Sequence, residues 1–247
     1  MNRVHKDKFL FLIIQLCFIF ILTPFQFDKN IFGEKTNKII DDFEDYKIDI
    51  FEKWLLRSST IDEAMRIYKI KTSSNNKFLH AESYGTSIQI AKKVNWELKH
   101  YPVISWRWRA IKLPEGANES KNKTNDSAAG IYIIFPRFRI PFLPWKYHPI
   151  NVIKYVWSKS LSKGKILKKE KVKLGQTIYK GRFYILQSGN ENNKDWIKEQ
   201  RNVLEDYKTF FGEKPRYDPI LVGILTDSND TKSVAKADYD DILIKQN

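Results

Sequence analysis

Two arginines in the stretch ISWRWRA, residues 104–110, have the clearest capacity for binding chemistry, because a guanidinium donates charge-assisted hydrogen bonds to polar or anionic ligands. Alternation with period two separates bulky and polar side chains onto opposite faces of a strand. One face holds Ile104, Trp106 and Trp108, and the other holds Ser105, Arg107 and Arg109. Burying two indole rings is worth roughly 3–6 kcal/mol, so we expect the tryptophan face in a core. The arginine face is then outside the core and is available to bind a ligand.

We expect these arginines to act with polar residues of later segments. The candidate ligand-binding set is Arg107, Arg109, Asp126, Arg201 and Asp206. If the two strand arginines meet carboxylates such as Asp126 or Asp206, they are structural. If they line an open groove, they bind a ligand, with an aromatic ring stacking on a sugar face beside them.

No catalytic residue is predicted. The chain has neither a nucleophile elbow nor a glycine-rich phosphate loop. Beyond the leading segment it has only three histidines, at 80, 100 and 148, with no short ligand spacing, which argues against a hydrolytic zinc. Catalytic triads and glycosidase carboxylate pairs are defined in space, so both stay open.

Two acidic clusters lie at the ends of the folded region. They are DDFED (Asp41, Asp42, Glu44 and Asp45) and DYDD (Asp238, Asp240 and Asp241). First and last strands of a sandwich are often neighbours, so these carboxylates could converge on a structural calcium ion. A charged edge that blocks aggregation explains them equally well. No other cofactor is expected. Asp227 opens a poor match to a calcium-loop template, because Lys232 stands where glycine is needed, and we interpret that stretch as a polar turn.

The formal net charge of +14 favours an anionic partner. Behind an export signal, acidic polysaccharide or an anionic membrane surface is a better partner than nucleic acid, which we do not expect. A diffuse lysine excess that only aids solubility is the alternative.

The N-terminus resembles such a signal. Basic residues precede an apolar run from Phe9 to Leu22, and no small-residue cleavage site follows. We therefore expect a signal peptide or an N-terminal anchor over 1–22, a connector over 23–37, and a periplasmic or envelope-associated domain over 38–247. Cys17 is the only cysteine, so a disulfide framework is excluded.

Period-two alternation with turn punctuation dominates the remainder and predicts a mainly β fold, a single antiparallel β-sandwich of jelly-roll type. The expected strands are 65–72, 78–83, 87–94, 103–110, 130–135, 151–158, 176–179, 182–188, 220–226 and 237–245. Ser73 to Asn76 predicts a hairpin turn between the first two strands.

One helix is expected over 194–211, from an apolar stripe capped by Asn193 and ended by Gly212. The proline-rich loop 136–149 interleaves aromatic and basic residues. It suits a membrane or protein contact, or a loop folded back over the sandwich edge.

Several stretches, in order, resemble a family of uncharacterised bacterial exported proteins, domain of unknown function 3047. They are YPVISWRWRAIKLPEGANE, NDSAAGIYIIF, IKYVW, LQSG, WIKEQRNVLEDYKTFFGEKP and ILTDSNDTKSVAKADYDDILI. Matching positions include Tyr132, Asp126 and Asp227. The chain departs from the family pattern at Gly130, where the pattern has an arginine, and at Asn118, where it has an acid. The resemblance implies an envelope location and no established activity. A looser similarity, to carbohydrate-binding modules and galactose-binding-like domains, implies the jelly-roll architecture.

Together these features favour a non-catalytic binding domain for a glycan or another envelope ligand. The alternatives are a polysaccharide-active lyase or hydrolase on the same scaffold, and a structural module that binds another protein.

Overall fold

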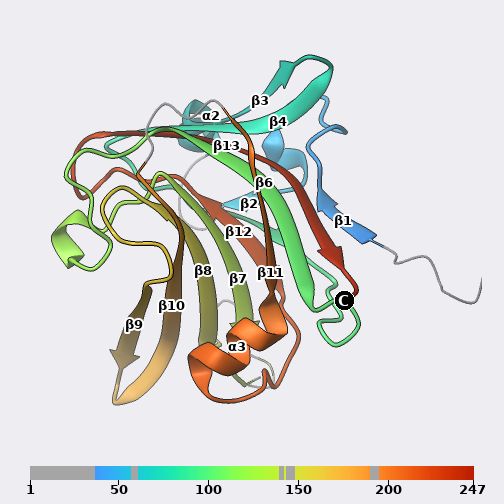
Figure 1. Cartoon of the computed structure of the whole chain (residues 1–247), viewed down its shortest axis with the longest axis vertical. Helices are drawn as coiled ribbons and strands as arrows, with labels where there is room; N and C mark the ends of the chain where they lie inside the picture. The colour runs from blue at the N-terminus through green and yellow to red at the C-terminus, as the bar shows by residue number, and fades with distance from the viewer. Residues whose placement is uncertain (1–36, 57–60, 139–141, 143–147, 190–194) are drawn as a thin grey trace, which may run out of the picture. The chain divides into compact units, whose positions relative to one another are not determined.

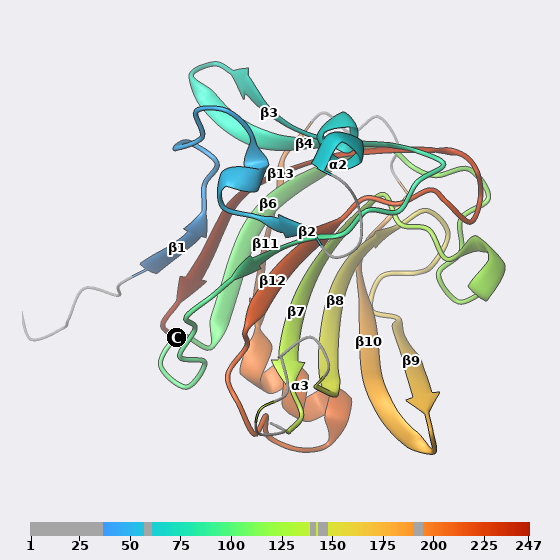
Figure 2. The same cartoon turned by 180° about the vertical axis from the view of Figure 1, so that it is seen from behind.

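The computed structural model describes residues 37–56, 61–138, 142, 148–189 and 195–247. Over these residues the chain is mainly β and forms two stacked sheets, a sandwich of jelly-roll type (Figures 1 and 2). The expected signal and connector, except for Asn37, lie outside the described residues. In the described part of the chain, no helix is long and apolar enough to cross a membrane.

The six-stranded sheet has the order β11-β6-β13-β4-β3, with β1 also paired to β13. Its strands are β1 (Asn37–Asp41), β3 (Tyr68–Ser73), β4 (Asn76–Tyr84), β6 (Val103–Lys112), β11 (Ile197–Asn202) and β13 (Val234–Lys245). The seven-stranded sheet has the order β2-β5-β12-β7-β8-β10-β9. Its strands are β2 (Leu55–Leu56), β5 (Ile90–Lys93), β7 (Ala129–Pro136), β8 (Ile150–Ser158), β9 (Ile166–Lys173), β10 (Gln176–Ser188) and β12 (Leu221–Leu225). The helical segments are η2 (Ile50–Glu52), α2 (Ile61–Ile67), η3 (Asn122–Thr124) and α3 (Val203–Phe211).

The sheets are antiparallel except at one pair. β8 and β10 run parallel, from Ile150 opposite Tyr179 to Ser158 opposite Ser188. The reason is that β9 follows β8 in the chain but pairs antiparallel on the far side of β10. The predicted all-antiparallel arrangement is therefore wrong at this pair.

Strands in which apolar and polar residues alternate were predicted correctly, whereas a strand of mainly charged residues was not. The hairpin at Ser73–Asn76 is confirmed, with Ser74 and Asn75 both at positive φ, as a two-residue turn requires. β9 was missed because its sequence, ILKKEKVK, is that of a charged edge strand. The expected break near Gly181 is absent, since β10 runs through it. Residues 61–67, partly predicted as strand, form α2.

The predicted helix over 194–211 is half wrong. Residues 197–202 form edge strand β11 against β6, and α3 begins only at Val203. Between Trp196 and Val203 the apolar stripe had no member, because Glu199 and Gln200 occupy the positions that a helix would turn to the same face. Asn202 caps α3 by accepting from the Glu205 N–H at 3.0 Å, while Asn193 lies outside the described residues. The predicted stop at Gly212 is confirmed, with φ of 76°.

The core lies between the two sheets, and the tryptophan face of β6 enters it as predicted. Trp106 and Trp108 are fully buried. Trp106 stacks on Tyr155 with ring centroids 5.3 Å apart, and Trp108 meets Trp157 at 5.8 Å. These contacts join β6 to β8, in facing sheets, and they leave the arginine face of β6 outside.

Candidate functional site

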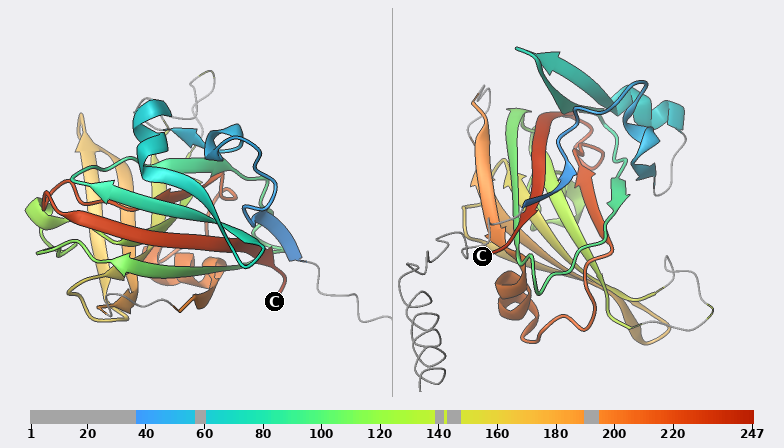
Figure 3. Two further views of the ribbon diagram at one scale, coloured as in Figure 1. Left: turned by 90° about the horizontal axis from the view of Figure 1, so that it is seen from above. Right: turned by 90° about the vertical axis from the view of Figure 1, so that its right-hand side faces the viewer.

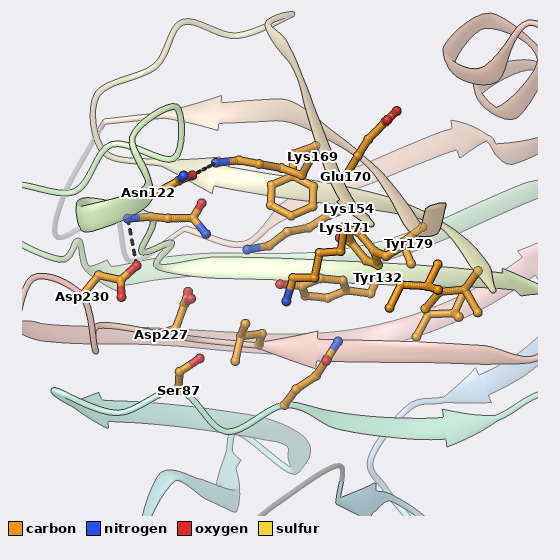
Figure 4. A pocket seen from close by; sticks show the side chains of 18 of the residues that line it. Ser87, Asn122, Tyr132, Lys154, Lys169, Glu170, Lys171, Tyr179, Asp227 and Asp230 are labelled. Carbon is orange, nitrogen blue, oxygen red and sulfur yellow. Dashed lines mark hydrogen bonds between the residues drawn. The ribbon is translucent and has the colours of Figure 1, made fainter. Parts of the chain in front are cut away.

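A cleft of about 1040 Å³ lies on the face of the seven-stranded sheet that is turned away from the core (Figure 4). Its floor consists of the outward residues of β7, β8, β10 and β12. The edge strand β9 and the turns around Asn122 and Asp230 form its walls. The apolar floor includes Tyr132, Ile134, Val152, Phe183 and Leu225, which pack in two clusters separate from the main core. The sheet therefore has apolar residues on both faces. Figure 3 shows its strands from two further directions.

Three glycines on the floor strands leave room for larger side chains to lie along the sheet. A Cβ at Gly130 would stand 2.6 Å from Cε of Lys154, and a Cβ at Gly181 would stand 2.9 Å from ring carbons of Tyr179. A Cβ at Gly223 would meet the Gln89 amide nitrogen at 3.3 Å. Glycine at these positions thus shapes the cleft through space, without any unusual backbone conformation.

Lys154, from the middle of β8, is the central charged group of the floor. It is 2% exposed. Its ammonium lies 5.0 Å from the ring centre of Tyr132 and 5.1 Å from that of Phe183, and it donates to Oγ of Ser127 at 3.0 Å. An ammonium has three N–H donors. Lys154 forms no ion pair within the described part of the chain.

Two acidic residues whose charges interact with this lysine have raised pKa values. Burial raises the pKa of Asp227 to about 6, against the lowering effects of the Lys154 charge and the Ser127 N–H, which donates to Oδ1 at 2.9 Å. Burial also raises the pKa of Glu119, which is fully buried and accepts from Oγ of Ser158 at 2.6 Å. A carboxyl group that titrates near neutrality in a cleft is a candidate for proton transfer.

A row of lysines follows one wall. Lys169, Lys171 and Lys173 alternate along β9, so all three face the cleft. Nζ of Lys169 donates to Oδ1 of Asn122 at 3.3 Å (Figure 4). Burial, and then the charge of Lys154, lower the pKa of Lys169.

The carboxylates of the described lining all have partners in the protein. The pairs are Asp227 with the Ser127 N–H (2.9 Å), Asp230 with the Asn125 N–H (3.2 Å) and Glu170 with Arg182 (3.3 Å). Each of these carboxylates is thus held by a donor of the protein, and the lysines supply further donors to the cleft.

The arginine face of β6 does not reach this cleft. On the outer face of the six-stranded sheet, Arg107 pairs with Asp240 at 2.6 Å and Arg109 pairs with Asp238 at 2.7 Å. Both guanidinium groups also stack on Trp196, at 4.9 and 4.7 Å from its ring centre. They meet carboxylates of β13 and not the expected Asp126 or Asp206, and this pairing makes them structural.

The other three candidates lie apart from these arginines. Arg201 of β11 binds Asp206 of α3 through Nε at 2.9 Å, and Asp206 also accepts from the buried Tyr155 hydroxyl at 2.7 Å. This pair fastens α3 to the margin of the core. Asp126 is fully buried and accepts from the Thr231 N–H at 2.7 Å, so it holds the turn that carries Asp230 into the cleft. Only Asp126 lies beside the cleft, and there it supports the turn.

Sequence reasoning missed Lys154, although a signal existed. In NVIKYVW, a single cation interrupts a run of apolar strand residues, and such a lysine must be accommodated inside the fold. The sequence marks Tyr132 only as a match to the family pattern, and Asp227 as such a match and as the start of a poor calcium-loop match. Their convergence depends on β7, β8 and β12 lying side by side.

The strands that begin and end the described chain are neighbours as predicted, since β1 pairs with β13 and Asp41 lies opposite Ile242. Their carboxylates bind protein donors, however. Asp41 accepts from Lys92 at 2.6 Å and from the Trp54 indole at 2.8 Å, and Asp240 accepts from Arg107. Among the described residues, no three side chains of His, Cys, Asp or Glu are grouped so as to hold a metal ion. The structural calcium stays a prediction. The stretch after Asp227 is the polar turn expected between β12 and β13.

The sequence matches the model of a protein family described as "Protein of unknown function (DUF3047)" over residues 52–243, which include every residue of the cleft. The chain belongs to this family. The space in front of Gly130 is filled by the stem of Lys154 from the next strand. A search of curated proteins finds no match.

Solved structures with a similar layout of strands include sugar-active proteins. A family 12 xyloglucanase from Bacillus licheniformis has 8% identity and a TM-score of 0.42, covering 85% of this chain and 100% of that one. An endoglucanase from Rhodothermus marinus has 10% identity and a TM-score of 0.41, covering 87% and 97%. A carbohydrate-binding module that recognises mannan has 8% identity and a TM-score of 0.31, covering 86% and 99%. These values describe strand layout and carry no information about the ligand of this family member.

Proposed function

We propose that this protein is a non-catalytic binding domain of the cell envelope and that it binds an acidic glycan in the cleft of the seven-stranded sheet. One observation carries the proposal: an apolar floor with tyrosines has Lys154 at its centre and is bordered by Lys169, Lys171 and Lys173. Tyrosine rings bury the apolar faces of sugars, and ammonium groups attract their carboxylates. The envelope location rests on the N-terminal segment, which lies outside the described residues.

The phenol of Tyr179 is a suitable sugar contact. It lies over Gly181 and stays half-buried, beside the lysine row of β9. Lys171 stands directly opposite it in the register of β9 and β10. A sugar seated on this tyrosine would have its charged substituents within reach of the lysines.

Binding is best measured by calorimetry with oligogalacturonate and its methyl-esterified form, which match in length and differ in charge. We expect saturable binding of the acid, weaker binding of the ester, and a loss of about tenfold or more in affinity for Tyr179→Ala, equivalent to about 1.4 kcal/mol. The melting temperature should not fall, because Tyr179 lies outside the main core.

The matched control is Arg109→Met, on the opposite sheet, which should bind the acid as the wild type does. If neither this probe nor a broad glycan array shows saturable binding, or if Tyr179→Ala binds normally, the proposal is wrong.

Asp227 favours a second candidate, a polysaccharide-active enzyme, since a carboxyl with a pKa of about 6 can transfer protons near neutral pH. Hydrolysis needs a second carboxyl across the bond. The other carboxylates of the described lining, Glu170 and Asp230, are bound to Arg182 and to the Asn125 N–H. We therefore favour binding. Release of reducing ends or unsaturated sugars from envelope polysaccharides, lost in Asp227→Asn, would establish the enzyme instead.

The predicted contact of loop 136–149 with a membrane or a protein concerns mostly residues outside the described ones, and it stays a prediction. Of the loop tip, Phe142 is described and fully exposed. A structural interaction module would depend on this loop and not on the cleft.

A further inference from the structure

Two ammonium groups lie together at the polar end of the cleft. Lys154 is almost completely buried, and one of its three N–H groups donates a hydrogen bond to Oγ of Ser127. Lys169 donates to Asn122, and the charge of Lys154 acts on its pKa. In Figure 4, Lys154 lies between Lys169 and Asp227. Neither lysine forms an ion pair in the described part of the chain, so both keep donors that face the cleft.

The neighbouring acids do not neutralise these lysines by direct contact. Asp227 accepts from the Ser127 N–H. Behind it, Asp126 accepts from Thr231, and Glu119 accepts from Ser158. Each of these acids accepts from a donor other than an ammonium group, and the two ammonium groups keep unused N–H donors. A bound anion would use those donors and would offset the repulsion between the two cations.

A purely structural role would be served better by another side chain. The stem of Lys154 lies in front of Gly130 and its head is flanked by Tyr132 and Phe183, a setting that a methionine of similar length would fill. Burying an ammonium there is unfavourable unless it has a charged partner. The charges of Asp227 and Glu119 act on Lys154 without direct contact, so a direct anionic partner is what a ligand would add.

We propose that the polar end of the cleft is a subsite for one oxyanion, a carboxylate, sulfate or phosphate substituent of the glycan, held by Lys154 and Lys169 with the Asn122 amide beside them. The glycan rests on the function proposed above, but the subsite also binds the small anion by itself. It makes the cleft selective for charged over neutral sugars, because a neutral group would leave both ammonium groups desolvated without a partner.

The test uses the full chain and the variants Lys154→Met and Lys169→Met, with Lys168→Met as the matched control, an exposed lysine of β9 that does not line the cleft. For Lys154→Met we expect affinity for oligogalacturonate to fall at least thirtyfold, and affinity for the methyl ester to stay within threefold. Lys168→Met should change either affinity by less than threefold. If Lys154→Met does not fold, Lys169→Met gives the same comparison, with an expected loss of about tenfold.

A second measurement needs no sugar. Acetate, sulfate and inorganic phosphate, each at matched ionic strength against chloride, should raise the melting temperature of the wild type but not of Lys154→Met, and the most effective anion identifies the substituent. If the acid and the ester bind alike to both proteins, and no anion protects the wild type selectively, the subsite is wrong although glycan binding stands. If no glycan binds but an anion protects only the wild type, the subsite stands and the glycan function is wrong.

Discussion

Replacing Asp227 by asparagine should stabilise the protein at pH 7.5 by up to about 3 kcal/mol and should leave its stability at pH 4 unchanged. Burial raises the pKa of this carboxyl from 3.8 to about 6, so the folded state holds its proton more firmly than the unfolded chain does. Stability contributed by the protonated form is present below pH 4 and is lost as the pH rises through about 6. Asparagine keeps the oxygen that accepts from the Ser127 N–H without the buried charge.

The measurement is urea unfolding of both proteins at pH 4 and pH 7.5, where a gain of this size also raises the melting temperature by roughly 6–12 °C. Asp45→Asn, at a carboxylate whose side chain is 86% exposed, is the control and should change stability by less than about 0.5 kcal/mol. A destabilised Asp227→Asn at pH 7.5, or an equal gain at both pH values, would show that the buried charge is not the cause. A charge that is unfavourable to the fold and yet lies in a cleft is typical of a functional position.

Replacing Asp206 by alanine should destabilise the protein by about 3 kcal/mol. The change leaves the Arg201 guanidinium and the buried Tyr155 hydroxyl without their acceptor. Because the side chain of Arg201 is 29% exposed, water reaches it, and we expect the lower end of the range for broken buried pairs.

Chemical denaturation measures this loss, and Glu205→Ala, an exposed neighbour on the same turn of α3, should change stability by less than about 1 kcal/mol. Binding of oligogalacturonate by folded Asp206→Ala should equal that of the wild type, since Arg201 and Asp206 lie outside the cleft. Unchanged stability together with weakened binding would show that Arg201 and Asp206 belong to the ligand-binding site.

The candidate residues show what a local sequence pattern can predict and what it cannot. Alternation in ISWRWRA correctly assigned the tryptophans to the core, because a strand's two faces follow from its period alone. The same pattern left open what the arginines meet, and the answer, Asp238 and Asp240, comes from a strand more than 125 residues later in the chain. The apolar stripe likewise predicted α3 but not its start, because pairing with β6 holds residues 197–202 extended.

By itself, the sequence determined a mainly β sandwich, its apolar strands, the hairpin at Ser73–Asn76, the end of α3 at Gly212 and membership of a family. These features depend on periodicity, turn chemistry and local order, which a single chain displays directly. Only the tertiary structure decided that β8 runs parallel to β10, that the candidate arginines are structural, and that Lys154, Lys169 and Asp227 share one cleft. The physical reason is that a binding site needs charges from several strands to be close in space, and strand order sets those distances independently of each strand's own pattern.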